Sequence, residues 1–432
     1  MASTPSVKSS SSAASRSRVW VLFRVATESA YAGKVKRTLS FWRDGDTALA
    51  LAGTCLIAGT YGLVRLAYGL FLPDLSASLD LGSAAAGVIS SGASIAYCVG
   101  ALVAAAADRH PRSLVAAALL AGSLGALGMA VAPGVAEFVP AAVVGSAGAG
   151  LASPALVAVV ARHVAARRRD RVQAVVNSGT GPGLVLAGLV ALVVLPHWRW
   201  GFLIGAVFTV AAGCAVLALS HSTSQPATKA TEGPGPIALI ALRVPVTAAF
   251  LLGIASAAVW TYGRTEIGDA GVGHTGAILG WMGIGVGGTA TVLTAGFLAR
   301  LRPGGAWALT AAGVAVSTGL LAATGGHASL AVAACLLFGW AFVAATSALI
   351  AWAAQTLEHR AATGTSVLFV MLTAGQAAGS AGVGALGGLD SLSTGFVLAA
   401  VTAVLAASCG VASVVRVGPG RVAAARRSRP AT

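Results

Sequence analysis

Residues 84–133 decide the fold, and they read AAAGVISSGASIAYCVGALVAAAA (84–107), DRHPR (108–112) and SLVAAALLAGSLGALGMAVAP (113–133). Two apolar runs flank a short turn that carries every charged residue of the stretch. A helix needs about 20 predominantly apolar residues to cross the hydrocarbon core of a bilayer. The stretch therefore predicts two antiparallel membrane helices joined by a charged loop.

The same pattern continues along the chain and predicts an all-α polytopic membrane protein. Longer polar stretches lie before the first span (1–46, basic and Ser-rich), between the sixth and seventh (221–244) and after the last (416–432). No cleavable signal-peptide pattern is present, so we expect the first span to be retained as a membrane helix. Twelve spans are expected, at approximately 47–72, 84–107, 113–133, 137–161, 172–195, 200–220, 245–265, 275–298, 305–324, 328–354, 361–387 and 393–415.

The composition supports this class and excludes others. Of 432 residues, 56% are hydrophobic and 9% are charged, whereas a soluble domain carries about 25% charged residues. The 56 glycines would weaken helices in water but allow close helix packing in lipid. A soluble enzyme, a disordered chain and a nucleic-acid binder are therefore excluded, despite the net charge of +15.

The positive charges predict the orientation in the membrane. If both termini are cytoplasmic, all but three of the 28 Lys and Arg residues fall on the cytoplasmic side, the exceptions being Arg65, Arg199 and Arg264. Such a bias is the usual topology signal of membrane proteins. We expect a multi-pass protein of the plasma membrane.

The twelve spans divide into two related halves, 47–220 and 245–415. The segment 221–244 is rich in Pro, Gly, Ser and Thr and is predicted to link them. The first helix of each half contains the same tripeptide, Thr60-Tyr61-Gly62 and Thr261-Tyr262-Gly263. Such parallel repeats are typical of one large class of secondary transporters.

The loop between the second and third spans carries a family pattern. It reads Ala104-Ala-Ala-Ala-Asp108-Arg109-His110-Pro111-Arg112 and resembles the Gly-x-x-x-Asp-Arg-x-Gly-Arg signature of the major facilitator superfamily. Both glycine positions of the signature are replaced here. The resemblance covers roughly 47–415 and implies two pseudo-symmetric six-helix halves that rock about a central site. It also implies that Asp108, Arg109 and Arg112, with the loop 300–302, hold the inner side closed.

Other elements bear on the subgroup. Gly179-Thr180-Gly181-Pro182-Gly183 in the fifth span is similar to the Gly-Pro motif of family antiporters, without its final Gly-Gly pair, and makes Gly181 and Pro182 coupling candidates. The segment 143–150 of the fourth span lacks the arginine that many proton-coupled drug exporters of the family have there. Its absence weakens an assignment as a drug/proton antiporter. Arg65 and Tyr68 resemble an Arg-aromatic first helix found in one subgroup.

Charged groups inside spans mark the candidate site, because a charge at mid-helix costs at least about 2.5 kcal/mol on insertion scales. Arg65 is expected to face the interior and to bind an anionic substrate or a carboxylate. Arg264 and Glu266 lie near the outer end of the seventh span. They are expected to form an outer gate with Arg65, or Glu266 is expected to carry a proton. Further polar or aromatic candidates for the cavity are Tyr61, Tyr68, Asn177, Trp260, Tyr262, Trp281, Trp352 and Gln376.

Motifs of enzymes and of metal or cofactor sites are absent from the sequence. The one Gly-x-Gly-x-x-Gly pattern, 382–387, lies inside an apolar helix and is interpreted as packing. We expect a transporter with no cofactor, no metal and no catalytic residue, acting as a monomer on a small molecule within the lipid bilayer. The favoured substrate is a small organic anion or metabolite, and the alternative is proton-coupled efflux of drugs or metabolites. Protons or another ion are the coupling partners considered, and a membrane enzyme or sensor is the third, disfavoured hypothesis.

Overall fold

A computed structural model describes residues 45–107, 110–220, 240–357, 360–389 and 391–416. The polar segments 1–44, 221–239 and 417–432 lie outside the described residues, as do Asp108 and Arg109. The chain from Ala50 onward forms one compact unit, and it is described by itself. Among the described residues, twelve helices are long and apolar enough to cross a membrane, which confirms the predicted number.

The N-half, residues 45–220, supplies six of these spans. Its first span is a composite of three consecutive elements, and its fifth is interrupted by a turn at Ser178–Gly179. The elements are α2 (Gly45–Ile57), η1 (Ala58–Leu66), α3 (Ala67–Leu79), α4 (Ser83–Ala106), α5 (Pro111–Val131), α6 (Val135–His163), α7 (Ala166–Asn177), α8 (Thr180–Val194) and α9 (Trp198–Leu219).

The C-half, residues 240–416, repeats the six-span pattern. Its third span begins with Pro303, as the third span of the N-half begins with Pro111, and proline is favoured at the first turn of a helix. The elements are α11 (Arg243–Ile267), η2 (Gly268–Val272), α12 (His274–Leu298), α13 (Pro303–Ala322), α14 (Ala328–Thr356), α15 (Ala361–Leu389) and α16 (Leu392–Arg416).

The main departure from prediction concerns the first and seventh spans. The first continues to Leu79 rather than ending near residue 72, and the seventh continues to Val272 rather than ending near residue 265. Pro73 lies inside α3 without ending it, as membrane helices tolerate when the backbone is otherwise satisfied. We call the end of the bundle that holds Leu79 and Ser83 the outer end, following the predicted orientation.

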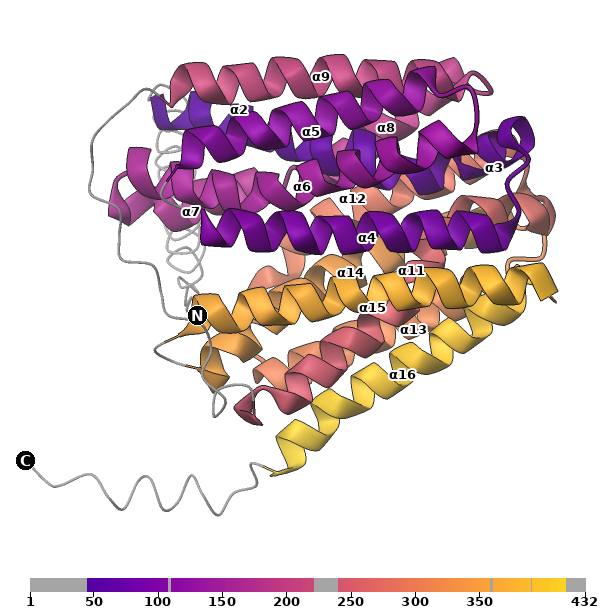
Figure 1. Cartoon of the computed structure of the whole chain (residues 1–432). Helices are drawn as coiled ribbons and strands as arrows, with labels where there is room; N and C mark the ends of the chain where they lie inside the picture. Colours follow the sequence, from indigo (N-terminus) through magenta and orange to yellow (C-terminus); the bar gives the residue numbers. More distant parts are fainter. Residues whose placement is uncertain (1–44, 108–109, 221–239, 358–359, 390, 417–432) are drawn as a thin grey trace, which may run out of the picture. The chain divides into compact units, whose positions relative to one another are not determined.

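The two halves meet mainly through three pairs of helices: α3 packs on α11, α4 on α15 and α8 on α12. Figure 1 shows α4 and α15 running side by side at this junction. Glycine makes the close approach possible. A Cβ at Gly69 would lie 2.1 Å from the Trp260 carbonyl oxygen, and one at Gly87 would lie 2.3 Å from that of Ser380. The junction is therefore backbone against backbone, as small residues permit in membrane bundles.

Candidate functional site

A π-helix in the middle of the first span carries the candidate cation. Element η1 runs over nine residues, Ala58–Leu66, and holds both Tyr61 and Arg65. A hydrogen-bond pattern of i→i+5 widens the turn, and such segments occur frequently at functional sites. Gly62 lies here against the backbone of Gly183 on α8, where a Cβ would approach within 2.4 Å. The local sequence AGTYGLVRL thus favours close packing over a regular α-helix.

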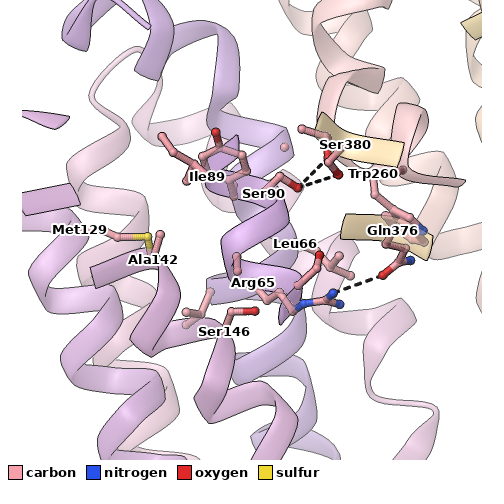
Figure 2. A pocket seen from close by; sticks show the side chains of 17 residues that line it. Arg65, Leu66, Ile89, Ser90, Met129, Ala142, Ser146, Trp260, Gln376 and Ser380 are labelled. Carbon is pink, nitrogen blue, oxygen red and sulfur yellow. Dashed lines mark hydrogen bonds between the residues drawn. The ribbon is translucent and has the colours of Figure 1, made fainter. Parts of the chain in front are cut away.

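Arg65 reaches across the junction to the C-half. Its Nη2 donates to Oε1 of Gln376 on α15 over 3.2 Å, and its guanidinium carbon lies 4.5 Å from the ring centroid of Tyr97 on α4. Both partners are uncharged. Arg65 forms no ion pair with any carboxylate of the described residues. Figure 2 shows the guanidinium between the halves, with the amide of Gln376 facing it.

Arg65 and Gln376 line a cavity at the junction of the halves. Its free volume is about 40 Å³, which holds a few water molecules but no metabolite. The lining mixes apolar, hydroxyl and aromatic side chains and includes no carboxylate and no cation besides Arg65. The residues are Val64, Arg65, Leu66, Tyr68, Gly69, Ile89, Ser90, Ala93, Ser94, Met129, Ala142, Ser146, Ala257, Trp260, Thr261, Gln376 and Ser380.

Three hydroxyl groups close one side of this cavity. Ser90 on α4 lies 2.9 Å from Thr261 on α11 and 3.0 Å from Ser380 on α15, and Thr261 lies 3.0 Å from Ser380. These contacts join the N-half to two helices of the C-half. Neither Ser90 nor Ser380 was among the cavity residues predicted from the sequence. The signal that could have found Ser90 is the i, i+4 spacing of Ser90 and Ser94, which places two hydroxyls on one helix face.

Two polar groups of the lining have no partner among the described residues. Ser146 on α6 is 1% exposed and its Oγ makes no hydrogen bond, and the Nε1 of Trp260 on α11 is also buried and unpaired. An unpaired buried donor costs about 1–3 kcal/mol relative to a satisfied one. Groups of this kind in a cavity are suited to bind a ligand. Ser146 was missed because an isolated serine in an apolar helix has no distinctive pattern.

The predicted tyrosines have different positions. Tyr68 lines the cavity and donates to the Ala86 carbonyl oxygen over 2.9 Å. Tyr61 does not line it, but its hydroxyl lies 2.6 Å from that of Tyr97, whose ring faces Arg65. Tyr262 is buried outside the cavity lining and donates to the Ser83 carbonyl oxygen over 2.9 Å. Tyr262 therefore joins α11 to the outer end of α4.

Three other candidates are not brought to the cavity. Asn177 is exposed at the end of α7, where its side chain accepts a hydrogen bond from Gln173 over 2.9 Å, so its placement in the cavity was wrong for this conformation. Trp281 is buried against Trp260, with ring centroids 6.3 Å apart. Trp352 packs on Trp307, 6.0 Å away, within the C-half.

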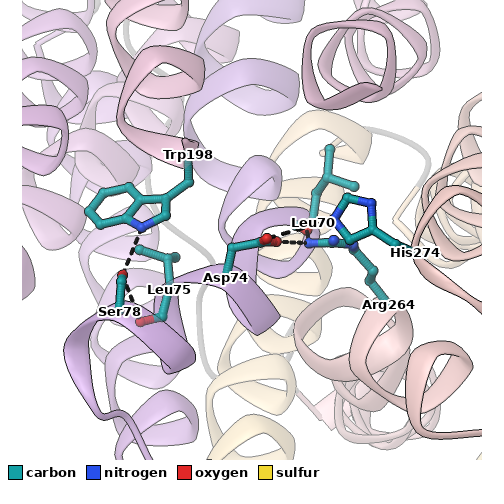
Figure 3. A network of polar contacts seen from close by, with 7 residues as sticks. All are labelled: Leu70, Asp74, Leu75, Ser78, Trp198, Arg264 and His274. Atoms are coloured by element: carbon teal, nitrogen blue, oxygen red, sulfur yellow. Dashed lines mark hydrogen bonds and ion pairs between the residues drawn. The ribbon is translucent and has the colours of Figure 1, made fainter. Parts of the chain in front are cut away.

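Arg264 lies away from Arg65 and pairs with another group. It is 2% exposed and forms an ion pair with Asp74 on α3, and it also donates to the Leu70 carbonyl oxygen over 2.6 Å. His274 at the start of α12 lies 3.6 Å from the second carboxylate oxygen of Asp74 (Figure 3). Arg264 is thus paired with Asp74, and not with Arg65 as the predicted outer gate required. Asp74 lies two residues beyond the predicted end of the first span, near residue 72, and falls inside α3.

Glu266 is also separate from the cavity. It is 3% exposed, and its Oε1 accepts a hydrogen bond from Ser393 on α16 over 2.5 Å. No described cation forms an ion pair with it. Glu266 therefore remains a buried carboxyl group near the outer end, within the C-half, rather than a partner of Arg65.

The Gly-Pro element lies at the junction of the halves. Gly181 and Pro182 follow the turn that separates α7 from α8. A Cβ at Gly181 would lie 2.5 Å from Thr289 Oγ1 on α12. The interruption of the fifth span thus falls where the helix crosses the opposite half.

The loop between the second and third spans is described only in part. Asp108 and Arg109 lie outside the described residues. Arg112 donates to the Leu217 carbonyl oxygen over 2.9 Å and to the Ser220 carbonyl oxygen, at the C-terminal end of α9. A cation there satisfies carbonyl groups that a helix end leaves free. Arg112 thus joins two helices within the N-half, while Arg300 and Arg302 are exposed.

Twelve apolar helices in two six-helix halves, with a polar cavity between them, define a multi-pass membrane transporter. Residues 54–380 match the sequence profile of the Major Facilitator Superfamily, and the chain belongs to that family. This confirms the resemblance and the fold class. No relative among curated protein sequences is similar enough to count as a match.

Solved transporter structures share the fold. A mutant of the nucleoside transporter NupG is similar over 84% of this chain and 99% of its own, at 16% identity and a TM-score of 0.68. A D-xylose–proton symporter is similar over 85% and 97%, at 16% identity and 0.65. A bacterial homologue of the human lysosomal transporter Spinster, inward-facing and unoccupied, is similar over 85% and 96%, at 13% identity and 0.66. Likeness at these identities concerns the fold alone.

Proposed function

We propose that this protein is a secondary active transporter that moves a small organic anion by alternating access. The observation that carries the proposal is the environment of Arg65. Its guanidinium lines the cavity between the halves, and the hydrogen bond and the ring contact that it makes among the described residues are with the neutral Gln376 and with Tyr97. An arginine so far inside a membrane protein is costly and marks a substrate or ion pathway.

The charge balance of the cavity supports an anionic substrate. Its lining contains one permanent cation and no carboxylate. An anion that enters would supply the missing charge and could accept two parallel hydrogen bonds from the guanidinium. A cationic drug would meet repulsion from Arg65 in the same place.

Contacts near the outer end support alternating access. Arg264 with Asp74, and Tyr262 with the Ser83 carbonyl oxygen, both cross from the C-half to the N-half at this end. We interpret this arrangement as a conformation closed on the outer side. The small cavity means that the halves must move before a substrate can enter, with Gly181 and Pro182 as the proposed point of flexing in the fifth span.

Proteoliposome uptake tests the proposal. Labelled organic acids and cationic dyes are offered to the purified protein with and without a pH gradient. Saturable uptake of an anion is expected, with loss in Arg65→Ala and retention in Arg243→Gln, which removes an exposed arginine at the start of α11. Unchanged uptake of every anion by Arg65→Ala would contradict the proposal.

A second candidate function is proton-coupled efflux of drugs or metabolites. It is favoured by Glu266, a buried carboxyl group that accepts a hydrogen bond from the neutral Ser393. A carboxyl group without a cation can take up and release a proton as its surroundings change. Dye flux that is driven by a pH gradient and lost in Glu266→Gln would support this function over anion transport.

The cellular setting is proposed from the charge pattern. Both termini are proposed to be cytoplasmic in the plasma membrane, with the protein acting as a monomer. The loops at 108–112 and 300–302 then lie on the cytoplasmic side. There we propose that they stabilise the opposite, inwardly closed conformation.

A further inference from the structure

We infer that the substrate carries a single negative charge on a carboxylate, attached to a compact and largely apolar body. The inference rests on the proposed anion transport and narrows its substrate class. It assigns the carboxylate to Arg65, at the place that Oε1 of Gln376 now occupies. The cavity at the junction of the halves supplies the argument.

The number of charges in the cavity limits the charge of its ligand. Arg65 is the one Lys or Arg in the lining, and no histidine lines it. A monovalent anion is neutralised by this guanidinium. A dianion would leave one charge unpaired in a low-dielectric site, and an unpaired buried charge is strongly unfavourable. The lining therefore discriminates against dicarboxylates and phosphate esters.

The remaining surface of the cavity describes the body of the ligand. Ile89, Met129 and Ala142 present apolar atoms on one side, and Trp260 presents an aromatic ring on the other. A hydrocarbon or aromatic group fits such a surface. A sugar would need many partners, whereas the hydroxyls of Ser90, Thr261 and Ser380 are already hydrogen-bonded to one another, and an unpaired polar group is costly in a dry site.

Two unpaired groups refine this description. The Nε1 of Trp260 is a donor only, and Ser146 Oγ is buried without a partner. Each can donate to an oxygen of the ligand, such as a hydroxyl, a keto group or the second carboxylate oxygen. A short acid with one such oxygen would satisfy groups that the empty cavity leaves unpaired.

The contact between Arg65 and Gln376 explains how substrate binding would be coupled to the movement of the two halves. A carboxylate pairs with a guanidinium through its charge and can accept two parallel hydrogen bonds from it, which the single neutral amide oxygen of Gln376 cannot do. The ligand would therefore displace the Gln376 carbonyl oxygen, which lies 3.2 Å from Arg65 Nη2. One direct bond between the N-half and the C-half is then exchanged for a bond through the ligand.

The test compares ligands matched in size and different in charge. Butyrate, 2-oxobutyrate and benzoate are the monovalent probes, succinate and phthalate are the divalent ones, and butyramide and benzamide are neutral. Binding is measured by thermal protection of the purified full-length protein and transport by uptake into proteoliposomes. We expect at least one monovalent probe to bind roughly tenfold or more tightly than its neutral partner, which lacks the charge, and than its divalent partner, whose second charge stays unpaired.

Variants separate this inference from the function on which it rests. Arg65→Gln should remove the preference for monovalent anions, Arg65→Lys should retain it, and Arg243→Gln should behave as the wild type. If divalent anions are bound as tightly and through Arg65, anion transport stands and the single charge is wrong. If neutral probes bind equally, if Arg65→Gln changes nothing, or if no probe protects the protein, both are overturned.

Discussion

Arg264 on the seventh span and Asp74 on the first form a buried ion pair that ties the two halves together near their outer ends. The side chains are 2% and 10% exposed, and the guanidinium also donates to the Leu70 carbonyl oxygen. Neither charge can turn to water without separating α3 from α11. The pair therefore acts as a contact of one conformation, and its disruption should be visible in both stability and shape.

Removal of one partner should destabilise the protein more than removal of both. Asp74→Asn or Arg264→Met leaves a buried charge unpaired, which costs about 3–5 kcal/mol in buried pairs that have been measured. The double variant removes both charges and should recover a large part of the loss. The melting temperatures of the wild type, the two single variants and the double variant, measured in detergent by tryptophan fluorescence, form a double-mutant cycle. A double variant whose loss equals the sum of the two single losses would show that the pairing contributes nothing.

Reversal of one charge should open the outer end. Asp74→Arg places a second cation against Arg264, so α3 and α11 should separate. Spin labels at Ala85 and Leu389, both exposed and on opposite halves, report the distance by electron paramagnetic resonance. A shift to longer distances is expected, with no shift in Asp80→Asn, which alters an exposed carboxylate nearby. An unchanged distribution in Asp74→Arg would rule out the pair as an outer closure.

A carboxylate placed beside Arg65 should compete with the substrate. Gln376→Glu sets a negative charge within hydrogen-bond distance of the guanidinium, because the amide oxygen is already 3.2 Å away. Anion uptake should fall by about tenfold or more, because the substrate would have to displace a like charge that is already paired with the guanidinium. Gln376→Met keeps the length of the side chain without a charge and should retain more activity. Equal uptake by the two variants would contradict the role of Arg65.

The glycine at the crossing of α3 and α11 should not tolerate a methyl group. A Cβ at Gly69 would lie 2.1 Å from the Trp260 carbonyl oxygen, so the helices must part. Overpacking of this kind costs about 1–3 kcal/mol, and Gly69→Ala should melt several degrees below the wild type. Gly296→Ala is the matched control, because no atom lies within 4 Å of its Cβ and alanine favours the helix. Equal melting temperatures for Gly69→Ala and Gly296→Ala would show that the close contact at Gly69 does not limit stability.

The fold was predictable because its signal is local. Apolar length identifies each span without knowledge of any neighbour, and all twelve were found. The errors in the predicted helix ends lie where a proline or a charged residue continues a helix, as Pro73 and Asp74 do in α3. Asp74 could be kept inside only because Arg264 neutralises it from another helix, and that partner is 190 residues away in the sequence.

The candidate site was predictable in its residues but not in its pairings. Arg65 and Gln376 stand out individually because a charge or an amide in an apolar run needs a partner. Their contact joins residues 311 positions apart and depends on how the halves pack. Tyr97, Ser146 and Ser380 were missed because single hydroxyl residues are frequent in membrane helices and give no periodic signal.

The glycine contacts between the halves have a mechanical consequence. Gly69 lies against the Trp260 backbone and Gly87 against that of Ser380. Because glycine has no side chain, neither residue inserts one into the other half. The two surfaces can part at these points by separating backbone from backbone, and the Trp281 ring and the Tyr262 hydroxyl are the C-half side chains that leave the glycines when they do. The same close approach restricts sequence change at Gly69 and Gly87, so new substrate preferences are expected to arise at the other residues of the cavity wall.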